Sequence, residues 1–477
     1  MSPLLLLLAA TTESFAIVVA NTDSTDGTLP KLSYADDDGA RWYELLSLTS
    51  RVRLLSVLDA DTQRQFPRVA EVARVPSRKE LDLALDETFE EISKARDRGA
   101  RTALFFVFAG HGSIGEDGQG YVHLVGGRFT RSDLFRRVAT ESPATVNHIV
   151  IDACNSYFMV ASRGSKEDES AIAVFLGQED TASFPSTGFL VSTSKAAEVH
   201  EWSRFASGVF SHEVRSALAG AADANGDGRV GYDEVRAFVA AANSAVKDPR
   251  ARLSIHATPP AVNLEEALFD RAQSRGPELV VPRELAGRLW LEDERGVRYL
   301  DLNMAKGSEV TLSLVPSSVY FLKSETTEIR IPIAPTQKAV ASRFPATKPR
   351  LVPRGSEELT FQNELFQVPF GADFVEGWKA SGELDPTRRL VSAGDGVSAR
   401  SVATGGAAVA AALALTGSVI FGLSANADAA KYRSAVGDSD VVDGYRTEAE
   451  SSARTANVLL AIGGGLVVTS LALWLWP

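Results

Sequence analysis

The chain has 477 residues, of which 45% are apolar and 23% charged, with a formal net charge of −12. At about 150 residues per domain, this length predicts about three domains, and the composition excludes wholesale disorder. The acidic balance argues against a nucleic-acid partner, because phosphate binding requires concentrated Lys and Arg. The single cysteine, Cys154, excludes an intrachain disulfide and a cysteine-rich zinc module.

Residues 14–245 have the pattern of an α/β domain. Short and nearly continuous apolar runs alternate with amphipathic segments, as in parallel sheets that helices cover on both faces. We therefore expect a mostly parallel central sheet flanked by helices. The predicted strands are Phe15–Ala20, Arg53–Leu58, Ala103–Ala109, Asn147–Ala153 and Gly188–Thr193, and the predicted helices are Asp36–Leu48, Arg78–Arg98, Thr130–Ala139 and Phe210–Ala221. Ser77 is expected to cap the second helix and Gly99 to end it.

The pattern changes after this domain. Residues 246–335 contain short alternating apolar runs separated by turn residues, which predicts a small antiparallel β-domain of the sandwich type. These runs are Gly287–Leu291, Tyr299–Leu302, Val310–Leu314, Val319–Leu322 and Ile329–Ile331. Residues 336–398, with many Pro and Gly, are typical of a partly ordered connector.

Both ends of the chain carry signals of export or membrane contact. Residues 1–13 contain an apolar run like the core of an export signal, although no basic residue precedes it. Residues 399–477 contain two uncharged stretches, Ser401–Ala427 and Thr455–Pro477, each longer than the roughly 20 residues that a helix needs to cross a bilayer. They predict a transmembrane helical hairpin in contact with lipid, and the alternative is a pair of buried soluble helices. Basic residues between the stretches favour an inside loop, with the preceding domains outside.

One histidine and the single cysteine follow two of the predicted strands. His111 lies between two glycines after Ala103–Ala109, and Cys154 directly follows Asn147–Ala153. If these strands are parallel neighbours, both side chains emerge at the C-terminal edge of the sheet, where open α/β sheets place their sites. Either residue alone is more often structural. Together they predict acyl transfer by a thiol that an imidazole activates.

The segments Phe106–Gly112 and Ile149–Ser156 resemble the histidine and cysteine motifs of caspase-like cysteine peptidases, the clan of caspases and metacaspases. Phe15–Asn21 followed by Leu32–Asp38 is similar to the family's first strand and the helix start after it, and Gly208–Ser211 resembles the opening of its late helix. The resemblance spans the whole predicted α/β domain and is greatest to bacterial members. It implies a caspase-like fold and polypeptide substrates. With the hairpin, it implies a bacterial inner-membrane protein whose catalytic domain lies on the periplasmic side.

The resemblance also implies a mechanism. Cys154 would attack the scissile carbonyl as a thiolate, and His111 would transfer the proton to the leaving amine. The backbone N–H groups of Gly112 and Cys154 would hold the oxyanion. The sequence shows no third member of a triad, which suits a His/Cys dyad.

The same resemblance implies cleavage after Arg or Lys, the P1 residue. Metacaspase-like members bind such side chains with two acidic residues, which fall here on Asp38 and Asp152, and paired carboxylates suit a basic group. The chain departs from this pattern at Ala109, where a serine is usual, and at Asn155, where a histidine is common. Alternatively, Asp36–Asp38 is an acidic cluster that the helix dipole favours at a helix start.

Residues 223–234 match the twelve-residue loop of an EF-hand, with helical segments before and after it. The predicted calcium ligands are Asp223, Asn225, Asp227, the carbonyl of Arg229 and both carboxylate oxygens of Glu234. EF-hands normally pair and only one is visible, so a helix–turn–helix without metal is the alternative. Bound calcium would stabilise or activate the neighbouring catalytic domain.

Three functions follow from these patterns. The leading one is a membrane-anchored cysteine endopeptidase that responds to calcium. The second is a catalytically weak caspase-fold scaffold whose β-domain and calcium loop mediate protein interactions at the membrane. The third is a calcium-dependent adhesion module. The presence of both His111 and Cys154 favours the enzyme.

Overall fold

The computed structural model describes residues 12–25, 29–116, 119–153, 183–192, 201–202, 207–247, 252–253, 255–334, 337–348 and 364–380. All of them belong to one compact unit, residues 1–387, and the second unit, residues 388–477, lies outside the described ranges. Residues 1–11 of the predicted export signal and both predicted membrane spans lie outside them too. Within the described ranges, no helix combines the length and the apolar character that crossing a membrane requires.

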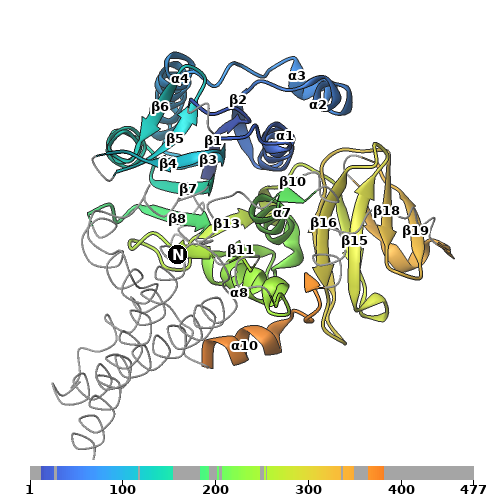
Figure 1. Ribbon diagram of the computed structural model, residues 1–477. Helices are drawn as coiled ribbons and strands as arrows, with labels where there is room; N and C mark the ends of the chain where they lie inside the picture. Colours follow the sequence, from blue (N-terminus) through green and yellow to red (C-terminus); the bar gives the residue numbers. More distant parts are fainter. Residues whose placement is uncertain are drawn as a thin grey trace, which may run out of the picture. The chain divides into compact units, whose positions relative to one another are not determined.

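A six-stranded sheet forms the centre of the α/β part, in the order β12-β8-β7-β3-β1-β2 (Figure 1). Every neighbouring pair is parallel except β12–β8. The mostly parallel α/β sheet is thus confirmed, and all five predicted strands are present. The strands are β1 (Thr12–Asn21), β2 (Ser50–Ser56), β3 (Arg101–Gly110), β7 (Val146–Ala153), β8 (Thr187–Ser192) and β12 (Ile255–Thr258).

Both faces of the sheet are covered because successive side chains of its strands are apolar on both sides. Val18 and Val107 belong to a buried cluster with residues of α1, α7 and α8, whereas Ile17 and Phe106 belong to a second cluster with residues of α4. The helices of this part are α1 (Ala35–Leu46), α2 (Ala60–Gln65), α3 (Pro67–Ala70), α4 (Arg78–Asp97), α5 (Arg131–Leu134), α7 (Val209–Ser216) and α8 (Tyr232–Asn243). Short π-helical turns, Phe135–Thr140 and Ala217–Ala221, continue α5 and α7.

The predicted limits of α4 have the expected local causes. The side chain of Ser77 accepts a hydrogen bond from the backbone N–H of Glu80, which satisfies one of the free donors of the first turn. Gly99 follows the helix with a φ of +84°, a conformation that glycine adopts without strain. Both predictions are confirmed.

Two sheets build the β-domain, one of five strands in the order β16-β15-β18-β19-β21 and one of three in the order β17-β14-β20 (Figure 1). All five predicted runs form strands. The strands are β14 (Glu278–Val281), β15 (Arg288–Asp293), β16 (Arg298–Asn303), β17 (Val310–Ser313), β18 (Val319–Lys323), β19 (Glu328–Pro332), β20 (Lys338–Val340) and β21 (Ala346–Thr347). Strands β20 and β21 lie in the predicted connector, as does helix α10 (Ala372–Ala380), so part of that segment is regularly folded.

Helix α7 joins the two parts through buried polar contacts. His212 Nε2 lies 2.8 Å from Asp301 Oδ2, and the backbone N–H of Asp301 donates to Ser216 Oγ at 3.1 Å. Arg298 Nε donates to the same Asp301 carboxylate at 2.6 Å. Burial alone would raise the pKa of Asp301, but Arg298 and His212 hold it well below its usual range. Burial lowers the pKa of His212 to about 4, so its imidazole is neutral at pH 7 and donates to Asp301.

We expect Asp301→Asn to lower the free energy of unfolding by about 3–5 kcal/mol, because Arg298 would keep a buried charge without its partner. The matched control is Asp61→Asn, which breaks an ion pair with Arg64 whose two side chains are 82% and 72% exposed. That change should cost less than about 1 kcal/mol. Urea unfolding of the full chain measures both, and equal effects of the two substitutions would contradict the assignment.

Candidate active site

Three neighbouring strands end side by side at the C-terminal edge of the sheet. Asn21 of β1 pairs with Gly110 of β3, and Gly110 pairs with Ala153 of β7. His111 therefore follows the last residue of β3, and Cys154 follows the last residue of β7 in the sequence. Cys154 itself lies outside the described residues. The predicted condition for a His/Cys site, two parallel strands that are direct neighbours, is met.

The imidazole of His111 is held by a backbone oxygen. His111 Nε2 lies 2.8 Å from the carbonyl oxygen of Pro30. Because a carbonyl can only accept, Nε2 carries the proton, and in the neutral ring Nδ1 has the free lone pair of a base. Burial lowers the pKa of His111, although Pro30 and Asp23 oppose that shift. The ring is thus neutral and oriented at pH 7, and the carbonyl of Pro30 serves as the orienting group that the sequence did not show.

Gly110 is required by the close approach of two strand ends. Its φ is +155°, and a Cβ at this position would lie 2.6 Å from the carbonyl oxygen of Asn21. A larger residue would push β1 away from β3 just before His111. Gly112, the predicted oxyanion donor, begins the short strand β4 (Gly112–Ile114), which pairs with β5 (Gly120–Leu124), itself paired with β6 (Gly127–Thr130).

A second histidine, His123, supports the same region. The backbone N–H of Thr25 donates to His123 Nδ1 at 3.0 Å, so Nε2 carries the proton and donates to Ser113 Oγ at 2.8 Å. The rings of His123 and His111 contact each other edge-on, with centroids 6.1 Å apart. His123 is fully buried and fastens the segment after β1 to the β4–β5 hairpin. No pattern in the sequence indicates this role for His123.

The two predicted P1-binding carboxylates converge on one glycine. The backbone N–H of Gly208 donates to Asp38 Oδ2 at 2.8 Å, and that of Ser211 donates to Asp152 Oδ2 at 3.1 Å. A Cβ on Gly208 would lie 2.9 Å from Asp152 Oδ2 and 3.2 Å from Asp38 Oδ2. The structure thus brings Asp38 and Asp152 together at the start of α7, where Asp38 accepts from the residue before the helix and Asp152 accepts from a residue of its first turn.

The alternative interpretation of the acidic cluster holds in part. Residues Asp36, Asp37 and Asp38 all lie in the first turn of α1. Asp36 Oδ2 accepts from the backbone N–H of Asp59 at 2.9 Å, so this carboxylate ties α1 to the start of α2. Among the described residues, Asp38 is the one of the three that accepts a hydrogen bond from the segment that opens α7.

A buried arginine that the sequence analysis missed completes the cluster. Arg215 Nη1 lies 2.8 Å from Asp38 Oδ1, and Arg215 Nη2 donates to Ser207 Oγ at 2.9 Å. Ser207 in turn donates to the same carboxylate of Asp38. Burial raises the pKa of Asp152 to about 7, with the charge of Asp38 adding to the shift and Ser211 and Arg215 opposing it. Near pH 7, Asp152 is therefore close to the midpoint of its titration.

The calcium-type loop has the backbone turns that its sequence predicts. The N–H of Gly228 donates to Asp223 Oδ2 at 3.0 Å, and the N–H of Arg229 donates to Asp227 Oδ1 at 2.7 Å. Glu234 accepts from the backbone N–H groups of Ala224 and Gly231. Asp223 is buried, and its Oδ1 has no hydrogen-bond partner among the described residues.

Two features of the loop differ from a paired EF-hand. Its short strand β11 (Arg229–Gly231) pairs with β13 (Ala267–Asp270) instead of a second loop of the same kind. Arg271 Nη1, just after β13, lies 3.3 Å from Asp223 Oδ2. Across the described part of the chain, no group of three or more His, Cys, Asp or Glu side chains is gathered as a metal site. Any cation here would depend on Asn225 and on the carbonyl of Arg229 as well.

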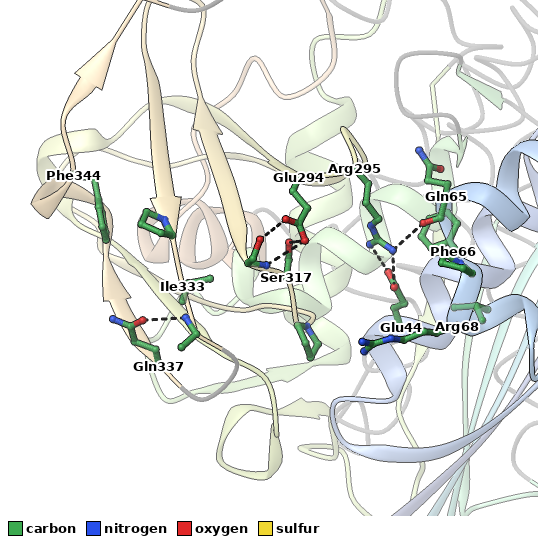
Figure 2. Close-up of a pocket in the computed structure, with 16 residues that line it drawn as sticks. Glu44, Gln65, Phe66, Arg68, Glu294, Arg295, Ser317, Ile333, Gln337 and Phe344 are labelled. Atoms are coloured by element: carbon green, nitrogen blue, oxygen red, sulfur yellow. Dashed lines mark hydrogen bonds and ion pairs between the residues drawn. The ribbon is translucent and has the colours of Figure 1, made fainter.

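A cavity of about 910 Å³ lies between helices α1–α3 and the β-domain (Figure 2). The buried Phe66 and Ile333 are part of its wall, and Arg295 at its rim pairs with Glu44 at 2.8 Å. None of the predicted catalytic, P1-binding or calcium-binding residues lines it. The predicted chemistry therefore lies elsewhere, at the sheet edge and in the loop.

Comparisons with known proteins give limited similarity. No family model matches the chain, and no curated protein matches it. Among solved structures, caspase-1 from Spodoptera frugiperda has a TM-score of 0.31 and 12% identity, covering 53% of this chain and 90% of that chain. A structure of pro-sf-caspase-1 has a TM-score of 0.30 and 16% identity, covering 52% and 88%. At these TM-scores the likeness does not decide the family.

We expect Asp152 to make stability depend on pH. Its carboxyl ionises near the ordinary value of 3.8 in the unfolded chain and near 7 in the fold. Between these values the unfolded state loses the proton and the folded state keeps it, so this contribution to stability falls as pH rises. Urea unfolding measures the free energy of unfolding of the unsubstituted chain and of Asp152→Asn at each pH. Between pH 5 and 7 this free energy should fall more steeply in the unsubstituted chain, by up to about 1.4 kcal/mol per pH unit. Above about pH 8 the two profiles should run parallel, and parallel profiles throughout would contradict the assignment.

Proposed function

We propose that this chain is a caspase-like cysteine endopeptidase, with Cys154 as the nucleophile and His111 as its base. The pairing of Gly110 with Ala153 carries the proposal, because each is the residue directly before one member of the dyad. The hydrogen bond between His111 Nε2 and the carbonyl of Pro30 supports it, since it selects the tautomer that a base requires.

The reaction follows from these roles. Nδ1 of His111 takes the proton of the Cys154 thiol, and the thiolate attacks the scissile carbonyl. The backbone N–H groups of Gly112 and Cys154 stabilise the oxyanion. The C–N bond then breaks, His111 gives its proton to the leaving amine, and the acyl group stays on sulfur as a thioester. Water, deprotonated by His111, hydrolyses the thioester and restores the thiol.

The substrate in this proposal is a polypeptide with Arg or Lys at P1. Asp38 and Asp152 converge at Gly208, and their carboxylates suit a guanidinium or ammonium group better than an acidic side chain. The membrane anchor of the proposal is the pair of uncharged stretches in residues 399–477. It assigns the chain to a bacterial inner membrane, with the catalytic domain on the periplasmic side.

The proposal predicts cleavage of fluorogenic peptides with P1 Arg or Lys by the full chain in detergent micelles. P1 Asp and P1 Ala peptides should be cleaved at least about tenfold more slowly, because they lack the charge-assisted contact. Cys154→Ala should remove cleavage, because it removes the nucleophile. His111→Ala should lower kcat/KM by at least about a hundredfold.

The control is Asn155→Ala, a change beside the nucleophile that leaves the dyad in place. Cleavage that survives Cys154→Ala would contradict the assignment of the nucleophile. If no peptide is cleaved by the folded chain, the scaffold function gains support in place of the enzyme.

We further propose that residues 223–234 bind calcium. The buried and unpartnered Oδ1 of Asp223 supports this, because an oxygen without a hydrogen-bond partner in the interior is costly unless a cation is available. The donor set would be Asp223, Asn225, Asp227, Glu234 and the carbonyl of Arg229, and such hard oxygen donors fit calcium. The cation would balance the negative charge of the loop and fasten the start of α8 to the segment after α7.

Calorimetric titration of calcium into the full chain tests the loop. We expect a dissociation constant between about 10⁻⁷ and 10⁻³ M, which is the range of such loops. Glu234→Gln should lower the affinity for calcium by at least about tenfold. Ala224 and Gly231 donate to different oxygens of Glu234, so Gln, with its single oxygen, retains one of these two hydrogen bonds at the helix start. The matched control is Asp233→Asn, one position earlier and outside the donor set, which should change affinity by no more than about twofold. No binding heat, or equal losses in both variants, would contradict the proposal.

A further inference from the structure

We propose that Arg215 sets the P1 specificity of this site by taking Asp38 out of substrate recognition, so that Asp152 alone contacts the charge of a basic P1 side chain. The inference rests on the proposed peptidase function. It changes the expected roles of the two carboxylates, since the metacaspase-like pattern assigns P1 binding to both.

Asp38 already has a complete set of partners inside the fold. Its carboxylate accepts from Gly208 N–H at 2.8 Å, from the hydroxyl of Ser207 and from Arg215 Nη1 at 2.8 Å. The side chains of Asp38 and Arg215 are only 3% and 4% exposed. A buried carboxylate with a guanidinium and two neutral donors has its charge neutralised and most of its acceptor sites used.

Arg215 is held in place by more than this ion pair. Its Nη2 donates to Ser207 Oγ at 2.9 Å, and its guanidinium lies 5.8 Å from the ring centroid of Trp42. It projects from α7, which is itself bound to the β-domain through His212 and Ser216. A P1 side chain that displaced Arg215 from Asp38 would leave the buried guanidinium of Arg215 without its partner, which is strongly unfavourable.

The charge of the next acidic side chain is influenced by a second buried arginine. Burial raises the pKa of Asp37 to about 7, and the positive charge of Arg41 opposes that shift. Arg41 is buried as well. Burial lowers the pKa of Arg41, and the negative charge of Asp37 is the strongest influence that opposes this shift. Near pH 7 the carboxyl of Asp37 is therefore only partly ionised, whereas Asp38 is held in an ion pair by Arg215.

Asp152 differs from Asp38. Its hydrogen bonds among the described residues come from neutral donors, the backbone N–H of Ser211 at 3.1 Å and the Ser211 hydroxyl. The positive charge of Arg215 also acts on Asp152, but no ion pair joins them. The Ser211 hydroxyl in turn accepts from Trp42 Nε1 at 3.1 Å. Asp152 also lies two residues before Cys154, whereas Asp38 reaches the cluster from α1. Because Asp152 is in no ion pair among the described residues and Asp38 is, Asp152 is the carboxylate that gains more from a basic side chain of the substrate.

The experiment compares P1 Arg with P1 citrulline, its neutral isostere, in otherwise identical fluorogenic peptides. The readout is the ratio of the two kcat/KM values, so a variant with a lower absolute rate is still informative. The variants, all of the full chain, are Asp152→Asn and the double change Asp38→Asn with Arg215→Gln. The double change removes both charges together and leaves amide groups that can hydrogen bond to each other, to Ser207 and to Gly208, so that no unpaired charge remains in the interior.

We expect Asp152→Asn to lower the Arg/citrulline ratio by at least about tenfold, and the double variant to keep it within about threefold of the unsubstituted chain. If the Arg/citrulline ratio falls as far in the double variant as in Asp152→Asn, the inference is overturned, whereas the proposed peptidase function still stands. Each variant is also made with Cys154→Ala, so that the peptides bind without being cleaved. Calorimetry must then rank the variants in the same order by the ratio of their affinities for the P1 Arg and P1 citrulline peptides. If the unsubstituted chain neither cleaves nor binds either peptide, the peptidase proposal fails, and this inference fails with it.

Discussion

Helix α7 is held by buried charged groups of both parts of the protein, and the geometry of the candidate site depends on it. Arg215, near its end, pairs with Asp38 of α1, and the N–H of Ser211, in its first turn, donates to Asp152 of β7. Its other contacts reach the β-domain, where His212 binds Asp301. Because a buried charge without its partner is costly, the helix cannot shift without breaking contacts in both directions. The β-domain is therefore part of the framework that sets the distance between the two carboxylates.

The sequence predicted the α/β part well because its signal is strong and local. The central strands are nearly continuous apolar runs, which burial on both faces of a parallel sheet requires, and the His111 and Cys154 positions follow from where those runs end. Strand β12 was missed, since Ile255–Thr258 is a short antiparallel edge strand with alternating polar residues. Strands β20 and β21 were missed for a similar reason, as two- and three-residue strands have no periodicity to read.

The partners of the site residues could not be predicted in the same way. Arg215 and Asp38 are 177 residues apart in the sequence, and His111 and Pro30 are 81 apart. The oxygen that orients His111 belongs to the backbone, so no residue type marks it in the sequence. Arg215 lies in α7 with a second charged residue, Glu213, so its residue type alone does not mark it, and nothing local indicates which acid it meets. Long-range pairing of this kind is decided by the fold as a whole.

Helix α7 is also fixed at the end from which the calcium-type loop starts. The π-helical turn Ala217–Ala221 continues α7 directly, and the loop begins two residues later at Asp223. Gly220 ends the helix with a φ of +112°, and a Cβ there would lie 2.5 Å from the carbonyl oxygen of Thr311 in β17. The end of the helix is therefore fixed against the β-domain, while the loop beyond it is the part that a cation would rearrange. Because that end is fixed, a rearrangement of the loop would leave Arg215 and the sheet that carries His111 in place.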